Sequence, residues 1–367
     1  MLKKLSLAAI IAVSGVSFAS ATPLTDAIKN VDLSGMIRFR FYHESDKSYS
    51  TRWRTSSDFK FTIPVSEELK LTYKLGVEGN IYNKAVSGKT TVYDPTVNEN
   101  LVFFTYKNNG LTALVGKIPV ATPVTGSGHG EAHGAGAIAL YNVNENFTVA
   151  AAGIDNITNV DAVSQANGGK NIYAVAGIYG QDNVKAQLWY FNVKDIIKSD
   201  IVAMVTYKMD NIIAKVDFAT AKLDNTISNK TQTYFNISAK YAADGMCAKV
   251  GYAQTGKDGG TVVLDNDAPI AAVLPTAQVY AITNTTDTTA LYAKVGTKLE
   301  NGLSPYAAIS YVDNKGADDK ATEIQLGAKY KYTKKLGIHV YYSMLNGDKE
   351  TTYSDNNEFR FEAKYSF

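Results

Sequence analysis

Several side chains that could take part in metal binding or proton transfer fall in one glycine-rich segment, residues 119–135. It holds His129, Glu131 and His133, which are residue types that bind metals or transfer protons. Two histidines four residues apart chelate a metal ion only on a helix, and the neighbouring glycines disfavour a helix. The spacing also differs from the HExxH pattern of zinc enzymes. We therefore expect polar loop residues here and no zinc-enzyme site, and we leave open whether this segment holds a cation loosely.

No other pattern in the chain suggests catalysis. There is no serine–histidine–aspartate order, carboxylate pair or phosphate-binding glycine loop in a context that would support a reaction. We therefore expect neither enzymatic activity nor a cofactor.

The arginines form the second group with a distinctive chemistry. The chain has only five, namely Arg38, Arg40, Arg52, Arg54 and Arg360. All five fall on the polar phase of segments in which apolar and polar residues alternate. A guanidinium offers a permanent charge and a fixed geometry, whereas lysine would serve in simple salt bridges. Two interpretations stay open: a functional row of arginines, or ion pairs with Asp58 and Glu362 that only stiffen the structure.

The elements that carry these residues are predicted by a period of two. Residues 359–367 alternate strictly between apolar or aromatic and charged or polar types, and they end on Phe367. A strand with this pattern is apolar on one face and polar on the other. In a transmembrane barrel the apolar face meets lipid and the polar face meets a water-filled lumen. The pattern predicts 18 strands, at 31–42, 51–63, 69–82, 100–107, 111–118, 136–143, 147–154, 171–179, 184–193, 201–208, 212–221, 233–241, 246–255, 289–298, 303–312, 321–332, 336–344 and 357–367.

The connections between these segments alternate in length. Short ones such as 107–110, 180–183 and 243–245 are rich in asparagine, aspartate and glycine, which favour tight turns. Longer loops lie between them, at 83–99, 119–135, 155–170, 222–232, 256–288 and 345–356. Short turns at one end, long loops at the other and an even strand number are typical of bacterial outer-membrane barrels. We expect an all-β fold, a transmembrane antiparallel β-barrel of about 18 strands.

Composition and the first residues agree with an exported barrel. Residues 1–21 have the layout of a signal peptide, with Lys3 and Lys4, an apolar run and a small-residue cleavage site. A single barrel domain at 22–367 would then remain, with equal numbers of basic and acidic residues, which gives no reason to expect a nucleic-acid partner. The single cysteine, Cys247, excludes an intrachain disulfide framework.

A barrel of this width leaves an aqueous channel whose selectivity depends on what narrows it. The segment 119–135, the third long loop, is the candidate, because its glycine and alanine content allows close packing on an inner wall. Lys117 stands at its start and joins the candidate constriction. Barrel closure makes the arginine-bearing strands neighbours, so we expect one arginine wall. We hypothesise that this wall faces Glu131 across the pore and creates a transverse field.

The longest loop, 256–288, leaves three interpretations open. Residues 261–264 and 270–274 are apolar pieces inside it. They form a hairpin above the membrane, a segment folded into the lumen, or another strand pair that would make 20 strands.

The start of the mature chain resembles a known family. Residues 21–24, residues 26–35 and the following Ile37-Arg38-Phe39-Arg40 are similar to the mature start of the major outer membrane protein porins of Campylobacter and relatives. The final Phe367 and Val115-Gly116-Lys117 also fit. The resemblance implies an 18-stranded trimeric porin with an inward third loop and a preference for cations. The predicted lumen faces hold about 17 basic and about 6 acidic residues, which favours anions, so the sign of the selectivity stays open.

We therefore expect a porin of the cell outer membrane, surrounded by its lipids, that passes ions and small hydrophilic solutes passively. A substrate-specific channel is one alternative, and a surface adhesin or structural barrel that uses the 256–288 loop is another. Small residues on the predicted lipid face, such as Ala137, Ala139 and Ala151, suit the contact of a homotrimer.

Overall fold

The fold was analysed in a computed structural model of the chain. The structure describes residues 30–45, 49–85, 90–91, 94–127, 131–166, 169–349 and 352–367. The predicted signal peptide at 1–21 and the candidate residue His129 lie outside the described residues.

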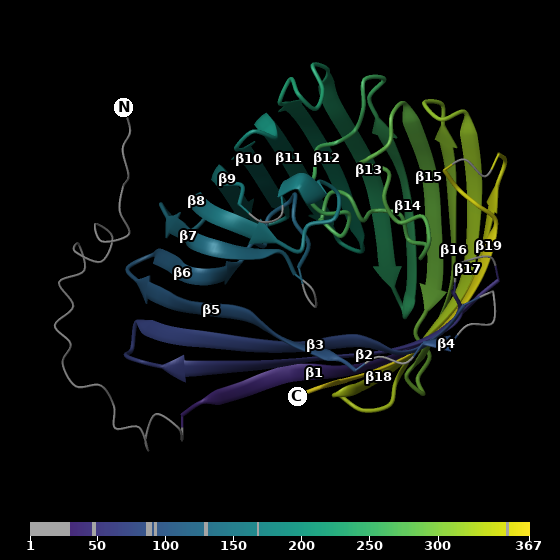
Figure 1. Cartoon of the computed structure of the whole chain (residues 1–367), viewed down its shortest axis with the longest axis horizontal. Coiled ribbons are helices and arrows are strands. Elements are labelled where there is room, and N and C mark those ends of the chain that lie inside the picture. The colour runs from purple at the N-terminus through teal and green to yellow at the C-terminus, as the bar shows by residue number, and fades with distance from the viewer. Residues whose placement is uncertain are drawn as a thin grey trace.

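One antiparallel sheet closes on itself into a barrel (Figure 1). The strands in the described residues are β1 (Asp32–Glu44), β2 (Tyr49–Pro64), β3 (Leu69–Ala85), β4 (Thr90–Thr91), β5 (Thr96–Asn108), β6 (Leu111–Pro119), β7 (His133–Asn142), β8 (Phe147–Thr158), β9 (Ile172–Gln181), β10 (Val184–Val193), β11 (Ile197–Met209), β12 (Ile212–Leu223), β13 (Thr231–Ala243), β14 (Met246–Thr255), β15 (Thr288–Thr297), β16 (Leu303–Asn314), β17 (Asp319–Lys331), β18 (Leu336–Gly347) and β19 (Asn356–Ser366). The two-residue β4 pairs only with the last residues of β3 and is not a separate strand of the wall. The wall therefore has 18 strands, and the predicted fold class and strand number are confirmed.

Helical structure is minimal in this barrel. Among the described residues it consists of one short 3₁₀ turn, η1 (Ser164–Ala166). No helix in that part of the chain is long and apolar enough to cross a membrane.

The barrel closes where the two ends of the chain meet. β19 pairs with β1 in a register that sets Lys364 opposite Arg38 and Glu362 opposite Arg40. The amide of Gly35 donates to the carbonyl of the final residue, Phe367, over 2.9 Å. The alternating final strand is therefore the seam that leaves the sheet without a free edge.

The short turns are built by residues that tolerate a left-handed backbone. Asn109 and Gly110 join β5 to β6 with φ values of 46° and 81°, and Asp244 and Gly245 join β13 to β14 with 48° and 77°. Positive φ at both positions fits the twist of a tight hairpin. The asparagine-, aspartate- and glycine-rich turns expected from the sequence are thus explained by backbone geometry.

Apolar side chains cover the outside of the wall. Leu188, Val250 and Leu326 are between 54% and 58% exposed, because the outward phase of each strand has no protein to pack against. The residues before them, Gln187, Lys249 and Gln325, are polar or charged and point inward. This separation follows from the period of two and matches lipid outside and water inside.

The longest loop folds into the lumen and forms no further strand pair (Figure 1). Its apolar pieces, which include Val262, Leu264 and Ile270, are 0–1% exposed. Two lysines of the wall are hydrogen-bonded to this loop. The ammonium of Lys215 donates to the carbonyl of Pro269 over 3.2 Å, and that of Lys249 donates to the carbonyl of Val273 over 2.7 Å. The 20-strand interpretation is therefore wrong, and so is that of a hairpin above the membrane.

The described part of the 119–135 loop packs against this internal segment. The carbonyl of Val124 accepts hydrogen bonds from the amides of Leu264 and Asp265, over 2.8 and 3.2 Å. Val120 and Val124 are buried against Leu264 and against inward-facing side chains of the wall such as Phe191. Two loops that are far apart in the sequence thus form one internal layer.

Candidate constriction of the channel

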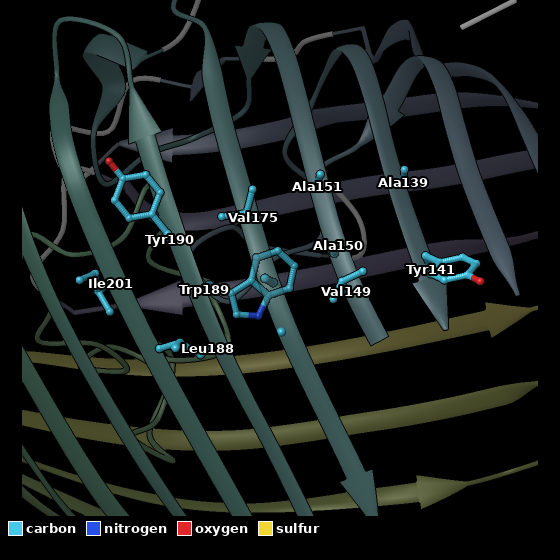
Figure 2. Close-up of a pocket in the computed structure, with 12 residues that line it drawn as sticks. Ala139, Tyr141, Val149, Ala150, Ala151, Val175, Leu188, Trp189, Tyr190 and Ile201 are labelled. Carbon is cyan, nitrogen blue, oxygen red and sulfur yellow. The ribbon is translucent and has the colours of Figure 1, made fainter. Parts of the chain in front are cut away.

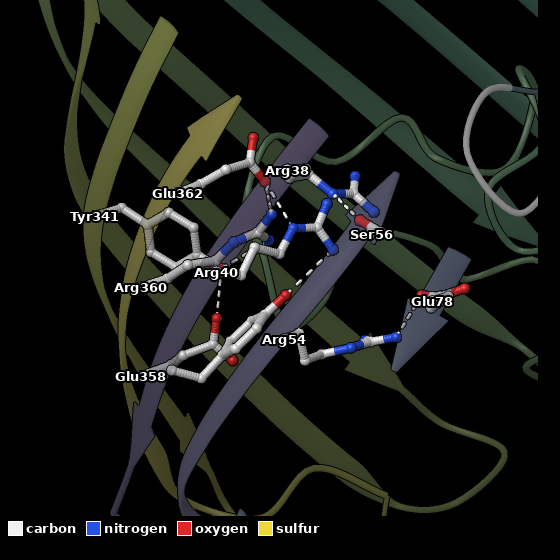
Figure 3. Close-up of polar contacts among 10 residues, drawn as sticks. Arg38, Arg40, Arg54, Ser56, Glu78, Tyr341, Glu358, Arg360 and Glu362 are labelled. Carbon is white, nitrogen blue, oxygen red and sulfur yellow. Dashed lines mark hydrogen bonds and ion pairs between the residues drawn. The ribbon is translucent and has the colours of Figure 1, made fainter. Parts of the chain in front are cut away.

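The arginine wall spans β19, β1 and β2, which are neighbours in the closed sheet (Figure 3). Arg40 and Arg360 share a single carboxylate, that of Glu362, with N–O distances of 2.7 and 2.6 Å. Arg38 donates to the neutral hydroxyl of Ser56 over 2.9 Å. In the described residues no carboxylate forms an ion pair with Arg38. The carboxylate of Glu358 lies next to this group and accepts from the hydroxyl of Tyr341. Three guanidiniums and two carboxylates leave this part of the wall with a net positive charge.

The remaining arginines are individually neutralised. Arg54 pairs with Glu78 over 2.6 Å, and Arg52 pairs with the buried Glu44 while it lies over the ring of Tyr42. For these two arginines the interpretation as wall-stiffening ion pairs describes what the structure contains. The five arginines therefore divide into a charged group and a neutralised group.

Glu131 lies on the same side of the pore as the arginine wall. Its carboxylate pairs with Lys74 of β3 over 2.7 Å, and Lys74 also contacts Asp58 over 3.4 Å. These groups line, with Arg38, one cavity of about 390 Å³. The hypothesis that Glu131 faces the arginines across the pore is therefore wrong. The reason is Lys74, whose buried ammonium holds the carboxylate at the wall.

Two other predicted residues also lie away from the charged wall. Lys117 pairs in the register with the outward-phase Val102, and its ammonium donates to the carbonyl of Glu99, so it belongs to the outer side of the wall. His133 is buried, and its Nδ1 lies 3.0 Å from the carbonyl oxygen of Glu131. This contact is within the end of the 119–135 loop. Among the described residues no group of three or more histidine, cysteine, aspartate or glutamate side chains could hold a metal ion.

A group of acidic side chains comes from the internal layer and from the loop between β8 and β9, which packs on it through the bonds from Ala162 and Val163 to the carbonyl of Leu264. The carboxylate of Asp265 accepts from the amide of Gly126 over 2.9 Å, and that of Asp161 accepts from the amide of Asn266 over 2.8 Å. Burial raises the pKa of Asp265 to about 6. Burial also raises the pKa of Asp267, and the guanidinium of Arg40 acts against this shift. Arg40 is therefore near enough to Asp267 to act on its charge, although the two side chains form no ion pair in the described residues.

Sequence reasoning missed this acidic edge. The signal was present as Asp265-Asn266-Asp267, two carboxylates placed between the two apolar pieces of the longest loop. Two carboxylates between two apolar pieces indicate a segment whose apolar parts are buried and whose edge is polar. A side chain at position 126 would collide with the Asp265 carboxylate, which explains the glycine there.

A buried carboxylate fixes the far end of the loop to the wall. Glu323 of β17 accepts three consecutive backbone amides, from Ala277, Gln278 and Val279, over 2.7 to 3.2 Å. Ser343 donates to the same carboxylate. Because Glu323 is fully buried, these donors satisfy a charge that would otherwise be costly. The internal layer is therefore attached at both ends and cannot be treated as a free surface loop.

These features together define an outer-membrane porin: a closed barrel with an apolar exterior, a polar lumen and internal loops that narrow it. The sequence matches the family described as Campylobacter major outer membrane protein over residues 1–367, and the chain belongs to that family. Its place is therefore the outer membrane of the cell. A comparison with curated proteins finds no match.

Solved structures share this fold at low sequence identity. OccAB3 of Acinetobacter baumannii is 14% identical, with a TM-score of 0.76 over 92% of this chain and 99% of its own. OccK3 (OpdO) of Pseudomonas aeruginosa is 15% identical, with a TM-score of 0.73 over 94% of this chain and 97% of its own. OpdK of P. aeruginosa, solved with vanillate, is 10% identical, with a TM-score of 0.74 over 92% of this chain and 99% of its own.

Proposed function

We propose that this porin is a general diffusion channel whose narrowest part lies between the arginine wall and the acidic edge of the internal loops. Ions and small hydrophilic solutes pass it passively, without catalysis. The observation that carries the proposal is the longest loop inside the barrel, which is hydrogen-bonded to the wall at Lys215, Lys249 and Glu323. Both sides are held in place, the wall by Glu362 and the loop by Glu323.

The charges of this constriction favour no single solute. Arg38, Arg40 and Arg360 supply positive charge, while Asp161, Asp265 and Asp267 supply negative charge. Opposite charges on two sides of a narrow aqueous path create a field across it. A hydrophilic solute with a dipole can align with this field, whatever its identity. The buried apolar pieces of the 256–288 loop also leave less of it available for attachment, which weakens the support for an adhesin.

Swelling of proteoliposomes tests the diffusion proposal. We expect the rate of swelling to fall steadily with the size of a neutral sugar and to differ little between isomers of one size. The reason is that a passive pore sorts by size and charge. Rapid uptake of one sugar alone among isomers of equal size would contradict general diffusion. So would a complete absence of swelling with every sugar tested.

We also propose a homotrimer that uses a shallow apolar groove on the outer face of β7 to β11 (Figure 2). The groove measures about 630 Å³. Its floor includes the small residues Ala139, Ala151 and Gly177, and large side chains such as Tyr141 and Leu188 stand around it. Small residues let neighbouring walls approach closely inside a membrane, where packing drives association.

Filling this groove is expected to separate the subunits. Ala151→Trp should shift the particle in detergent from three copies to one, measured by light scattering on a size-exclusion column. Val250→Trp, on the outer face of the distant β14, is the matched control and should leave the mass unchanged. A three-copy particle in both variants would show that the groove is not the interface.

A further inference from the structure

Three lysines stand side by side on the inner wall, far from the arginines in the sequence. In the register of β13, β14 and β15, Lys240 is opposite Lys249 and Lys249 is opposite Lys294. The residue after Lys249, Val250, is 56% exposed on the outer face, so the lysines take the inward phase. Like charges directly opposite each other on neighbouring strands are destabilising. Their alignment therefore needs a compensating negative charge.

The described residues supply only a shared negative charge to this lysine row, defined as Lys240, Lys249 and Lys294, because Asp217 acts on Lys249 without forming an ion pair with it. Nearby Asp217 is already occupied, by Lys215 over 2.9 Å and by the amide of Asn236 over 2.9 Å. Within the part of the chain that the structure describes, none of the three lysines forms an ion pair. Lys329 adds to the excess, because it lies close enough to act electrostatically on Lys294.

The contacts that the row does make hold its side chains without neutralising them. The ammonium of Lys294 lies 4.0 Å from the centre of the Tyr306 ring, and that of Lys249 lies 5.0 Å from the Tyr292 ring. Lys249 also donates to the carbonyl of Val273. Such contacts position a cation and leave its charge in place. The row is thus a preorganised line of positive charge that lacks a counterion of its own.

The row begins at the internal layer, which Lys249 contacts at Val273, and extends toward the end of the barrel that carries the short turns. Lys240 and Lys249 are near the tight turn at Asp244 and Gly245, and short turns mark the periplasmic end of such barrels. A solute that has passed the internal layer meets the row next.

We propose that the lysine row binds small polyanions that carry two or three carboxylate or phosphate groups on their way into the periplasm. This inference rests on the proposed channel. Neighbouring strands are about 4.8 Å apart, so the row spans roughly 10 Å, which suits charged groups separated by a few bonds. Weak binding at such a site raises the local concentration of the solute and still permits release.

Block of single-channel current by two probes tests the proposal. Citrate carries carboxylates and inorganic pyrophosphate carries phosphates, and each is added on the periplasmic side in KCl. The test variant is Lys240→Gln with Lys294→Gln, which keeps the contact of Lys249 with the internal loop. Lys185→Gln, an inward lysine on β10 outside the row, is the control.

We expect one or both probes to reduce the KCl current of the natural protein, and the concentration for half-block to rise about tenfold in the double variant but not in the control. Block by citrate alone would identify carboxylates as the ligand chemistry, and block by pyrophosphate alone would identify phosphates. An unchanged half-block concentration in the double variant, or no block of a normal KCl current, would overturn the lysine site while the channel stands. Absence of any KCl current would instead overturn the channel.

Discussion

Deleting residues 258–285 should raise the single-channel conductance roughly twofold or more, because the deleted segment fills part of the lumen. The strand ends that remain are already adjacent. Gln254 pairs with Thr289, and the amide of Asp287 donates to the carbonyl of Gly256 over 2.8 Å. A short turn can therefore replace the loop without disturbing the wall. The measurement is the current through single channels in a planar bilayer.

Two further variants test whether the change in conductance comes from the internal loop and not from loop shortening in general. Glu323→Ala removes the acceptor of three loop amides and leaves buried donors unsatisfied, which costs about 1–3 kcal/mol for each. We expect it to release the loop and produce a noisy, larger current even where the deletion fails to fold. Shortening the loop between β12 and β13 by residues 225–229 is the control and should change nothing. Equal conductance in all four proteins would refute the role of the internal layer.

Replacing Arg38 with serine is expected to lower the ratio of anion to cation permeability by roughly twofold or more. Arg38 carries the positive charge that no carboxylate in the described residues pairs with, whereas Arg40 and Arg360 share Glu362. Its removal therefore takes away a positive charge without an ion-pair partner beside the proposed constriction. The measurement is the zero-current potential across a bilayer with a salt gradient.

The matched control removes an ion pair of the same wall without changing net charge. Arg54→Ser combined with Glu78→Gln eliminates both members of a pair whose N–O distance is 2.6 Å. We expect the zero-current potential of this double variant to equal that of the natural protein. A shift as large as that of Arg38→Ser would mean that the selectivity does not depend on the unpaired arginine.

The wall of this barrel could be predicted from the sequence because its strands and turns are determined by residues that are close together in the chain. Alternation with a period of two decides which side chains meet lipid, and turn residues with positive φ decide where a strand reverses. The final strand even indicated where the sheet closes, since eight of its nine alternating residues pair in register with β1. Each of these signals is contained in a few consecutive residues.

The constriction depends on contacts between distant segments and could be predicted only in part. That the arginines form one wall followed from closure, but the partner of Glu131 did not, since Lys74 lies 57 residues away. The apolar pieces of the longest loop have the same composition as a lipid-facing strand, so burial against Val124 in the lumen was one of several equal interpretations. Lys117 was assigned by its position beside a loop, while the register places it on the outward phase.

The central claim, a water-filled channel narrowed by its own loops, is tested most directly by the current through the purified natural protein in a planar bilayer under a salt gradient. We predict steady, open conductance that rises in groups of three steps and stays well below that of the loop-deleted barrel. A folded protein that carries no current, or a natural channel as conductive as the deletion variant, would contradict the account.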